Sequence, residues 1–543
     1  MNLLKDLWGS FWNFGMKFNL IAFFLAVGVI PLAVAVESGP DIGPDEAIQR
    51  LTDGNNRYTA GEATHPRTDA ARAENSPYDW AFVRLDYARK EKVEQLKRFC
   101  ERVHELAARA RTDEVLVEFF DVNQKYYNMA HQGVASARFK SKITEFRKAL
   151  NNYYVENYLA FYDVLFVDKR GNILHSIRKE SDFQQNFIDG EPARTPLARC
   201  LQTDPREETF VDFHYYAASD EPAAFFVEPV HKDGEHLGWI VLQCAVNKIN
   251  SLFAGAEQLG ETGEAFVVNH QGYLLTESNF EGDSTILAKK LSSDNIRAKF
   301  DEKQGHRTVT DYRGFAALTS FEVVEFLGTQ WLVVAKVDEA QVTTEHFMQH
   351  RKYYADKVIH HLASLPVGRG KEPFAKTGQK IIRVDMDEFI KANHGELLKT
   401  VGVSTCTAVI ATYPGKFGYL AHISPLDKVY GAGATNLLGH ITKKIKNYDI
   451  YKYERRRVRF VIVANHFDSL TSIIDKLVDE GFLLSQISVL YHPRARCANV
   501  TYDYSQDRVN VEWLLAQTRA NRCIHHAGDS HNLETIVKHY LGG

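Results

Sequence analysis

The sequence predicts an α+β multidomain protein: an N-terminal membrane helix, two antiparallel sheet modules on a long helix, and then a layered α/β domain. The chain has 543 residues, which is more than one domain usually holds. A stretch with helical spacing, residues 87–106, gives way after Tyr158 to short runs with strand alternation. The net charge of −4 and the absence of a basic face argue against a nucleic-acid partner. The six cysteines show no C-x-x-C spacing, so no metal and no cofactor is expected.

Residues 18–36 carry no charge and have about the length that crosses a ~30 Å hydrocarbon core. Lys5 and Lys17 precede them and acidic residues follow, so the positive-inside tendency predicts an inner (cell) membrane location with the bulk of the chain extracytoplasmic, that is, periplasmic. Ala33-Val34-Ala35 also fits a signal-peptide cleavage site. Residues 1–36 are therefore expected to be a transmembrane anchor or a signal segment, and the anchor is favoured.

Residues 37–86 are expected to form a helical arm and loop. Within them, residues 45–72 resemble the N-terminal arm of β-carbonic anhydrases. That family binds zinc through a C-x-D-x-R segment and a later H-x-x-C, whereas this chain has Leu85-Asp86-Tyr87-Ala88-Arg89 at the first place and no H-x-x-C. Because zinc needs its complete set of ligands, the resemblance does not imply a zinc enzyme.

Strand alternation recurs in two sets between residues 162 and 338, with a tight-turn signal at Asp233-Gly234. The first set is 162–168, 172–176, 210–216, 223–232 and 238–245. The second set is 264–269, 273–277, 305–312, 315–325 and 330–338. A long helix followed by two such sets predicts two antiparallel sheet modules that share the helix.

Phe210-Val211-Asp212-Phe213 and Glu228-Pro229-Val230 resemble the membrane-distal module of double Cache (dCache) chemoreceptor-type sensor domains, which carry two PAS-like modules on a long helix. Residues 259–268 resemble the start of the proximal module, and residues 330–334 resemble its last strand. The resemblance covers about residues 87–341, and the sensor is predicted at 87–345. It implies a signal-transduction, chemotaxis-type function in which a small extracytoplasmic ligand binds to the sensor.

In such domains the ligand lies between the distal sheet and its covering loops. Acidic and phenolic side chains beside an apolar wall suit an amine or a small polar metabolite. The Arg-x-Trp pattern of amino-acid-binding members is not visible around Arg178, so amino acids are not predicted. Alternating Tyr and Phe also fit an ordinary core, which remains the competing interpretation. The candidate ligand-binding residues are Asp212, His214, Tyr215, Tyr216 and Ser219.

Residues 346–379 are expected to be a helix and a Pro/Gly/Lys-rich linker. Beyond them, alternating apolar residues predict a strand that ends shortly before Cys406. A second predicted strand follows Cys406, and a third ends at His422. This order places Cys406 and His422 at facing ends of neighbouring strands, where a thiol and an imidazole can form an activated nucleophile. Spacing alone more often indicates a buried core cysteine and a structural histidine.

The same stretch resembles the active-site signature of CheD, the deamidase of chemoreceptor glutamines. Thr400 lies six residues before Cys406, and an Ala-His pair that ends in His422 follows it. Ser404 and Thr405 stand where the family usually has Gly and Ser. The resemblance covers about residues 380–513 and implies a cysteine-dependent protein-glutamine glutaminase, in which Cys406 is the nucleophile, His422 the general base and Thr400 the residue that orients the imidazole.

Residues 514–543 are expected to form a helical tail. The sequence as a whole predicts a membrane-anchored sensor with a deamidase-like output. The expected partners are a small-molecule ligand, a protein glutamine substrate or receptor partner, the membrane, and a second copy of the chain that binds through the long helix. One alternative is a non-catalytic receptor whose CheD-like domain only binds a partner. Another is a cytoplasmic enzyme, because CheD acts in the cytoplasm while dCache modules sample the exterior.

Overall fold

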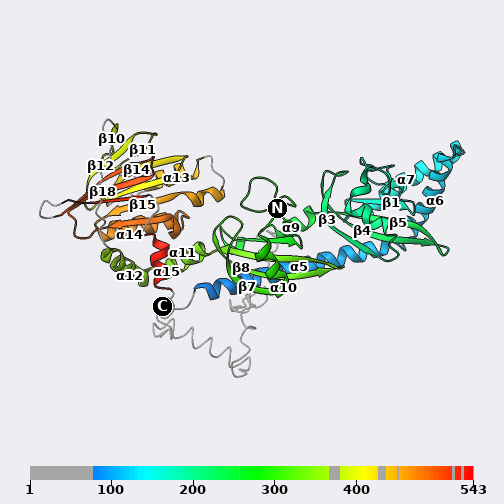
Figure 1. The fold of residues 1–543 in the computed structure, drawn as a ribbon, viewed down its shortest axis with the longest axis horizontal. Helices are drawn as coiled ribbons and strands as arrows, with labels where there is room; N and C mark the ends of the chain where they lie inside the picture. Colours follow the sequence, from blue (N-terminus) through cyan, green and yellow to red (C-terminus); the bar gives the residue numbers. More distant parts are fainter. Residues whose placement is uncertain are drawn as a thin grey trace, which may run out of the picture. The chain divides into compact units, whose positions relative to one another are not determined.

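The computed structural model describes residues 77–255, 257–365, 379–425, 436–448, 452–515, 520–526 and 531–541 (Figure 1). The predicted membrane segment 18–36, the arm at 45–72 and residues 366–378 of the predicted linker lie outside these residues. Within the described residues, two sheets that share a long helix are followed by a pair of facing sheets with helices on one side.

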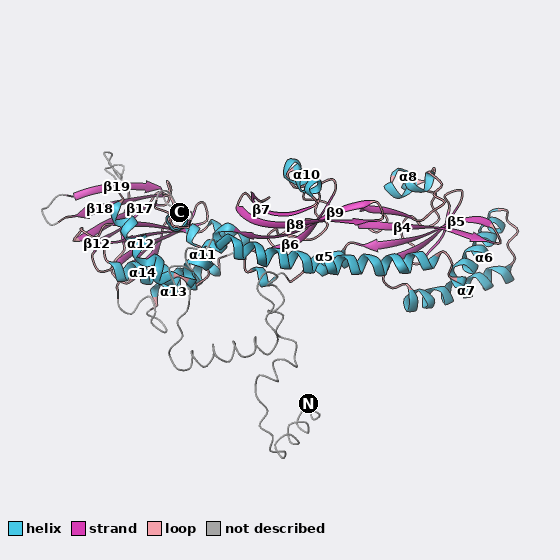
Figure 2. Cartoon of the chain, turned by 90° about the horizontal axis from the view of Figure 1, so that it is seen from below, coloured by secondary structure: helices cyan, strands magenta, loops and turns pink. Residues whose placement is uncertain are grey.

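The helix α5 (Pro77–Ala110) is 34 residues long. Apolar and small side chains recur at helical spacing along its buried face, together with Arg89 and Lys92, and the other charged side chains are half-buried or exposed. Figure 2 shows α5 running along two successive sheets, as the sequence predicts. The helices α6 (Glu114–His131) and α7 (Ala137–Asn157) follow, and the side chains of Asp113 and Ser136 cap their first turns.

The distal sheet has the strand order β2-β1-β5-β4-β3, and all its pairs are antiparallel. Asp233 and Gly234 both have positive φ between β4 and β5, which gives the predicted tight turn. One face of the sheet packs on the helices, and the other is covered by α8 (Pro196–Gln202) and the loops around it. The strands are β1 (Asp163–Asp168), β2 (Ile173–Ser176), β3 (Thr209–Tyr216), β4 (Glu221–Lys232) and β5 (Glu235–Ala245).

The proximal sheet follows the helix α9 (Asn247–Phe253) and has the antiparallel order β6-β9-β8-β7. Residues 273–277, which the sequence predicts as a strand, form only isolated bridges: Leu274 pairs with Val268 of the first strand of this sheet, and Tyr273 pairs with Lys290. The helix α10 (Ser293–Glu302) packs on the outer face. The strands are β6 (Glu264–Asn269), β7 (Gln304–Thr310), β8 (Ala316–Phe326) and β9 (Thr329–Asp338).

After β9 the chain continues through α11 (Glu339–Gln349) and α12 (Arg351–Ser364) into the C-terminal part, residues 379–541. This part contains two five-stranded sheets, with orders β10-β12-β17-β18-β19 and β11-β14-β13-β15-β16. The first comprises β10 (Ile381–Arg383), β12 (Leu397–Val403), β17 (Cys497–Asp503), β18 (Arg508–Leu514) and β19 (Ala520–His526). The second comprises β11 (Glu388–Lys391), β13 (Thr407–Tyr413), β14 (Phe417–Ile423), β15 (Arg459–Ala464) and β16 (Ile487–Tyr491).

Two apolar clusters hold these layers together. One lies between the two sheets and includes Ile410, Leu420 and Val500. The other lies between the second sheet and its helices, and includes Val409 and Ile473. The helices are α12, α13 (Leu437–Lys446), α14 (Phe467–Asp479) and α15 (Leu533–His539). The strand β13 is buried along its whole length because it has neighbours on both edges and layers on both faces.

The helical tail expected at residues 514–543 does not begin as a helix in the part of it that the structure describes, residues 514–515 and 520–526. The strand β18 continues to Leu514, and residues 520–526 form β19 beside it. Val509, Val511 and Trp513 are buried at alternating positions, which is the pattern of a strand with one face on a core. Tertiary pairing with β17 overrides the local helical propensity here. The predicted helix near the C-terminus is present as α15.

The prediction of an inner-membrane protein is wrong for the part of the chain described here. Among these residues, no helix combines the length and the apolar character that crossing a membrane requires. Helix α5 is long enough, but Lys90, Glu94 and Lys97 lie on its exposed face. Burying such charges in hydrocarbon is strongly unfavourable, so α5 packs on the sheets through its apolar face instead.

Candidate functional site

Cys406 lies in the connection between β12 and β13, immediately before Thr407 begins β13, and it is 8% exposed. Two hydrogen bonds fix this connection. The Ser404 hydroxyl donates to the carbonyl of Arg496 at 3.0 Å, and the Ser469 hydroxyl donates to the carbonyl of Thr405 at 2.5 Å. The thiol is therefore held at one end of the central strand of the second sheet.

His422 lies on β14, where it pairs with Ala408 of β13. Paired residues share a face and the side-chain period of a strand is two, so Cys406 and His422 lie on the same face of the sheet. The Thr400 Oγ1 and His422 Nδ1 atoms are 2.8 Å apart, and both side chains are buried. Thr400 belongs to β12 of the facing sheet, so this hydrogen bond crosses the core between the two sheets.

The other imidazole nitrogen, His422 Nε2, is buried and has no hydrogen-bond partner among the described residues. His422 is only 4% exposed, so water does not reach this nitrogen freely. A buried nitrogen without a partner is unusual in a folded protein. Thr400 occupies Nδ1, so Nε2 is the nitrogen that remains available. It can accept a proton from the Cys406 thiol, which lies on the same face of the sheet.

The short loop between β10 and β11, which contains Asp385, Met386 and Asp387, covers this face. The Met386 Sδ atom lies 3.9 Å from Cys406 Sγ, while the Met386 side chain is itself largely exposed. The backbone N–H of Asp387 donates to the carbonyl of His422 at 2.7 Å, and the backbone N–H of Ser424 donates to Asp387 Oδ1 at 3.1 Å. The loop is thus tied to the strand that carries the imidazole.

The charge of this loop affects both reactive groups. Burial, reinforced by the Asp387 carboxylate, raises the pKa of the Cys406 thiol. Burial also lowers the pKa of the His422 imidazole, although Asp387 and Asp385 act in the opposite direction. Both shifts favour a neutral thiol and a neutral imidazole near neutral pH.

The five candidate ligand residues do not converge on one point. Asp212 Oδ1 accepts a hydrogen bond of 2.9 Å from the indole of Trp331, on the proximal sheet. Tyr215 is 58% exposed and bonds to Asp220 at the surface. Asp212 lies within a register shift of β3 between residues 211 and 214, whereas Tyr215 faces away from its neighbours His214 and Tyr216 because side chains alternate along a strand.

His214, Tyr216 and Ser219 do share one face of the distal sheet. The rings of His214 and Tyr216 both contact Phe225 of β4. The Ser219 hydroxyl accepts a hydrogen bond of 3.0 Å from Gln243, which pairs with Phe225 in the sheet. This face is the one that α8 and its loops cover.

Two acidic residues that the sequence analysis missed complete this face. The Tyr216 hydroxyl donates to Asp182 Oδ2 at 2.6 Å, and Glu221 pairs with Tyr216 in the sheet. Asp182 Oδ1, Glu221 Oε1 and His214 Nε2 are buried and have no hydrogen-bond partner among the described residues. Burial raises the pKa of Asp182 although the Tyr216 hydroxyl opposes the shift, and burial together with Glu180 raises the pKa of Glu221.

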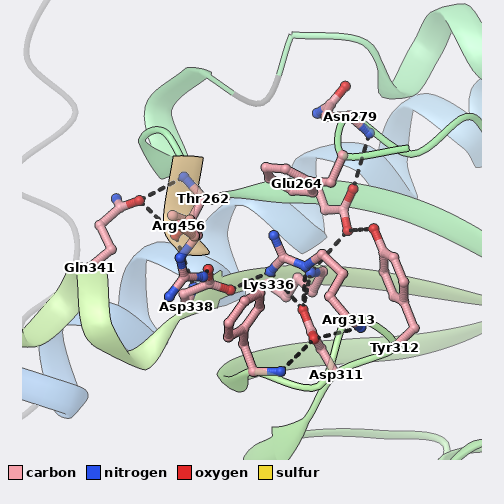
Figure 3. Close-up of polar contacts among 12 residues, drawn as sticks. Thr262, Glu264, Asn279, Asp311, Tyr312, Arg313, Lys336, Asp338, Gln341 and Arg456 are labelled. Carbon is pink, nitrogen blue, oxygen red and sulfur yellow. Dashed lines mark hydrogen bonds and ion pairs between the residues drawn. The ribbon is translucent and has the colours of Figure 1, made fainter. Parts of the chain in front are cut away.

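The proximal sheet contains a buried cluster of charges (Figure 3). Lys336 Nζ lies 2.6 Å from Asp311 and 3.0 Å from Glu264, and Arg313 pairs with both Asp311 and Asp338. None of these five side chains is more than 7% exposed. Burial would raise the pKa of Asp311, but Lys336 and Arg313 lower that pKa to about 2. The three carboxylates outnumber the two cations, so this cluster by itself carries excess negative charge.

Residues 86–345 match the family model dCache_1, a Cache domain. This match confirms the predicted resemblance to double Cache sensor domains. The comparisons do not support the resemblance of residues 380–513 to CheD or that of the N-terminal arm to β-carbonic anhydrases. No curated protein matches the chain.

Solved structures of ligand-binding domains are similar to the Cache part. The ligand-binding domain of a Pseudomonas fluorescens chemoreceptor in complex with L-serine has 12% identity and a TM-score of 0.30, and the match covers 48% of this chain and 96% of that one. The periplasmic sensory domain of a Campylobacter jejuni chemoreceptor has 12% identity and a TM-score of 0.32, with coverages of 48% and 95%.

An extracellular ligand-binding receptor from Desulfohalobium retbaense has 16% identity and a TM-score of 0.28. The match covers 43% of this chain and spans only 39% of that receptor.

The C-terminal part contributes one residue to the buried cluster of the Cache domain. Arg456, from the short helix η3 (Lys452–Arg457), forms an ion pair with Asp338 (Figure 3). Arg456 brings a third positive charge, so the cluster becomes neutral. Asp338 precedes α11, whose first residue, Glu339, is bound by Lys538 at 2.7 Å. Because an uncompensated buried charge is costly, this pairing favours contact between the C-terminal part and the Cache domain.

The local sequence gives little signal for the residues that were missed. Asp182 lies in a loop without periodicity, and Asp387 lies nineteen residues before Cys406 in a Val-Asp-Met-Asp-Glu segment that resembles an ordinary exposed turn. Both reach their sites through tertiary contacts. A buried strand that contains a lysine, such as β9 with Lys336, is the one detectable signal, because a lysine there needs a carboxylate partner.

Replacing Asp387 with Asn should increase the alkylation rate of Cys406 by iodoacetamide near neutral pH several-fold. The amide keeps an oxygen for the N–H of Ser424 but removes the negative charge that raises the thiol pKa. In the wild type, the rate should rise with pH as the thiol ionises above its ordinary range, and the midpoint should move to lower pH in Asp387→Asn. The measurement is the pH profile of Cys406 alkylation, followed by peptide mass spectrometry.

Asp385→Asn is the matched control. Asp385 raises the pKa of His422, but it is not among the causes of the Cys406 shift, so its removal should leave the midpoint for the thiol in place. A profile that is identical in the wild type and Asp387→Asn would contradict this description of the site.

Proposed function

We propose that this chain is a ligand-sensing signal-transduction protein. Its Cache domain, residues 87–345, binds a small polar ligand, and its C-terminal domain, residues 380–513, hydrolyses the carboxamides of protein glutamines. The observation that carries the catalytic half is the hydrogen bond between Thr400 and His422. It leaves Nε2 of His422 unpaired on the face that also carries Cys406.

In the proposed reaction, His422 Nε2 takes the proton from Cys406, and the thiolate attacks the carboxamide carbon of the glutamine. A C–S bond forms and the carbonyl oxygen becomes an oxyanion, which backbone N–H groups of residues 404–407 would stabilise. The C–N bond then breaks, and the nitrogen leaves as ammonia with the proton from the His422 imidazolium.

The second half of the reaction is the hydrolysis of the thioester. His422 Nε2 accepts a proton from water, whose oxygen attacks the thioester carbon. The C–S bond breaks, the thiol recovers its proton, and the glutamine has become a glutamate. Thr400 acts through His422: if the imidazole donates from Nδ1 to the Thr400 oxygen, Nε2 keeps the lone pair that both steps need.

The ligand site of the proposed sensor is the face of the distal sheet beneath α8. An amine would find Asp182 Oδ1 and Glu221 Oε1, two buried carboxylate oxygens without partners among the described residues, beside the aromatic ring of Tyr216. A cation pairs favourably with buried carboxylates and with the face of an aromatic ring. These residues support a small amine or an amine-bearing metabolite as the ligand.

A second candidate function is a non-catalytic receptor in which the C-terminal part only binds a partner. It is favoured by the covering position of Met386 and by the raised pKa of Cys406, both of which make the resting thiol a weak nucleophile.

A homodimer through the long helix also stays a prediction. Trp80, Val83 and Tyr87 lie on one face of α5 and are between 62% and 74% exposed, which suits a second copy as partner.

Replacing Cys406 with Ser should reduce ammonia release from an unfolded glutamine-containing protein, such as casein, by more than about a thousandfold, because the nucleophile is lost. Ammonia is measured by coupled assay, and new glutamates by mass spectrometry. Cys497→Ser is the matched control, since Cys497 is a half-buried cysteine in β17, outside the proposed site. Equal release from the wild type and Cys406→Ser would remove the enzymatic half of the proposal.

The ligand half is tested with a panel of small amines and amino acids, L-serine among them. At least one compound should raise the melting temperature of the wild type and bind in calorimetry. Asp182→Asn should weaken that binding about tenfold or more, equivalent to about 1.4 kcal/mol, because the charge is lost while the bond to Tyr216 is kept. Asp189→Asn, an exposed carboxylate nearby, should bind normally. Unchanged affinity in Asp182→Asn would disprove this site.

A further inference from the structure

Asn465 lies on the opposite side of Cys406 from His422. The strand β13 pairs with β14 on one edge and with β15 on the other, and Ala408 is the partner of both His422 and Val463. Asn465 follows the end of β15 directly, two residues after Val463, as Cys406 lies two residues before Ala408. Side chains two residues apart on a strand share a face, so the register places a carboxamide, a thiol and an imidazole side by side at one end of the sheet.

The hydrogen bonds of Asn465 fix the direction of its side chain. Asn465 Nδ2 donates to the carbonyl of Ala495 at 3.0 Å. The turn that carries this carbonyl is itself anchored, because the backbone N–H of His492 donates to the carbonyl of Ala464 and the backbone N–H of Ala495 donates to the carbonyl of His492. With Nδ2 engaged there, the oxygen atom is directed away from the turn.

That oxygen, Asn465 Oδ1, is buried and has no hydrogen-bond partner among the described residues. Buried carbonyl oxygens are nearly always paired in folded proteins, and this oxygen can accept a hydrogen bond from a bound ligand. His422 Nε2 is the second such atom at this end of the sheet. Two buried polar atoms without partners among the described residues therefore lie at this end of the sheet, one on β14 and one directly after β15.

We propose that Asn465 is a specificity-determining residue that selects primary carboxamides: its Oδ1 accepts a hydrogen bond from the NH2 group of the substrate. This inference rests on the proposed glutamine hydrolysis and names its recognition step. A primary amide presents an acceptor oxygen and two N–H donors in one plane. The oxygen would face the backbone N–H groups of residues 404–407, and one N–H would then face Asn465.

The same contact accounts for discrimination against esters. A glutamate γ-methyl ester has the same reactive carbon but no N–H, so it would leave Asn465 Oδ1 buried and unpaired. A site built to bond a donor rejects an analogue that lacks it, because the unpaired group remains desolvated. During cleavage the leaving nitrogen takes its additional proton from His422, while Asn465 holds one of the hydrogens that the nitrogen already carries.

The test uses two alkylating reagents that differ only in this group. Iodoacetamide carries a primary amide, whereas methyl iodoacetate carries an ester. The ratio of their rates at Cys406, measured in the full chain by peptide mass spectrometry, cancels any change in exposure or ionisation of the thiol. In Asn465→Ala the ratio should shift about tenfold or more toward the ester. Asn465→Asp, which keeps an acceptor oxygen, should retain the preference for the amide. If the alanine variant does not fold, this variant replaces it in the test, and a loss of the preference would contradict the inference.

Asn510→Ala is the matched control, because Asn510 Oδ1 is also buried without a partner but lies on β18 of the other sheet. Its ratio should equal that of the wild type. An unchanged ratio in Asn465→Ala would overturn the inference. Ammonia release separates the two proposals: a shifted ratio without any release from the wild type would leave amide recognition in place and remove the hydrolase, whereas release with an unchanged ratio would do the reverse.

Discussion

The hydrogen bond between Thr400 and His422 is the constraint on which the C-terminal part depends. It joins two sheets through their shared core, and it uses one nitrogen of a buried imidazole while leaving the other unpaired. The strand β13 lies between β14, which carries His422, and β15, which Asn465 directly follows, so the register puts the thiol of Cys406 between two groups of different chemistry. The imidazole can move a proton, and the carboxamide oxygen can hold one in place. This division of roles suits the carboxamide substrate that we propose.

A cluster of buried charges lies on the proximal sheet of the Cache domain. The Cache cluster around Lys336 and Asp311 has one carboxylate more than it has cations, and Arg456 from the C-terminal part supplies the missing charge. Asp338, which forms ion pairs with both Arg313 and Arg456, directly precedes the helix that leaves the Cache domain. Any rearrangement that separates the two parts would unpair Asp338 from Arg456 and leave the cluster with excess negative charge.

The sequence was sufficient for features that repeat or that lie close together along the chain. The amphipathic pattern of α5, the strand alternation of both Cache sheets and the turn at Asp233-Gly234 all have local causes, and the structure contains them. Cys406 and His422 could be placed on neighbouring strands because a single tight hairpin joins those strands. The sequence could not predict Asp182 or Asn465, since each owes its place to strand pairing or to a covering loop. The predicted membrane location of the protein came from the uncharged residues 18–36 and the charges around them. No helix among the described residues supports it.

The central claim is that His422 Nε2 is a free base beside Cys406, and the tautomer of His422 tests it most directly. Nitrogen NMR of protein labelled at histidine, with the signal assigned by comparison with His422→Gln, distinguishes the two ring nitrogens. Near neutral pH we expect the proton on Nδ1, where it is donated to the Thr400 oxygen, and an unprotonated Nε2. The opposite tautomer, with the proton on Nε2 and the Thr400 hydroxyl donating to Nδ1, would contradict the account, because that imidazole could not accept a proton from the thiol.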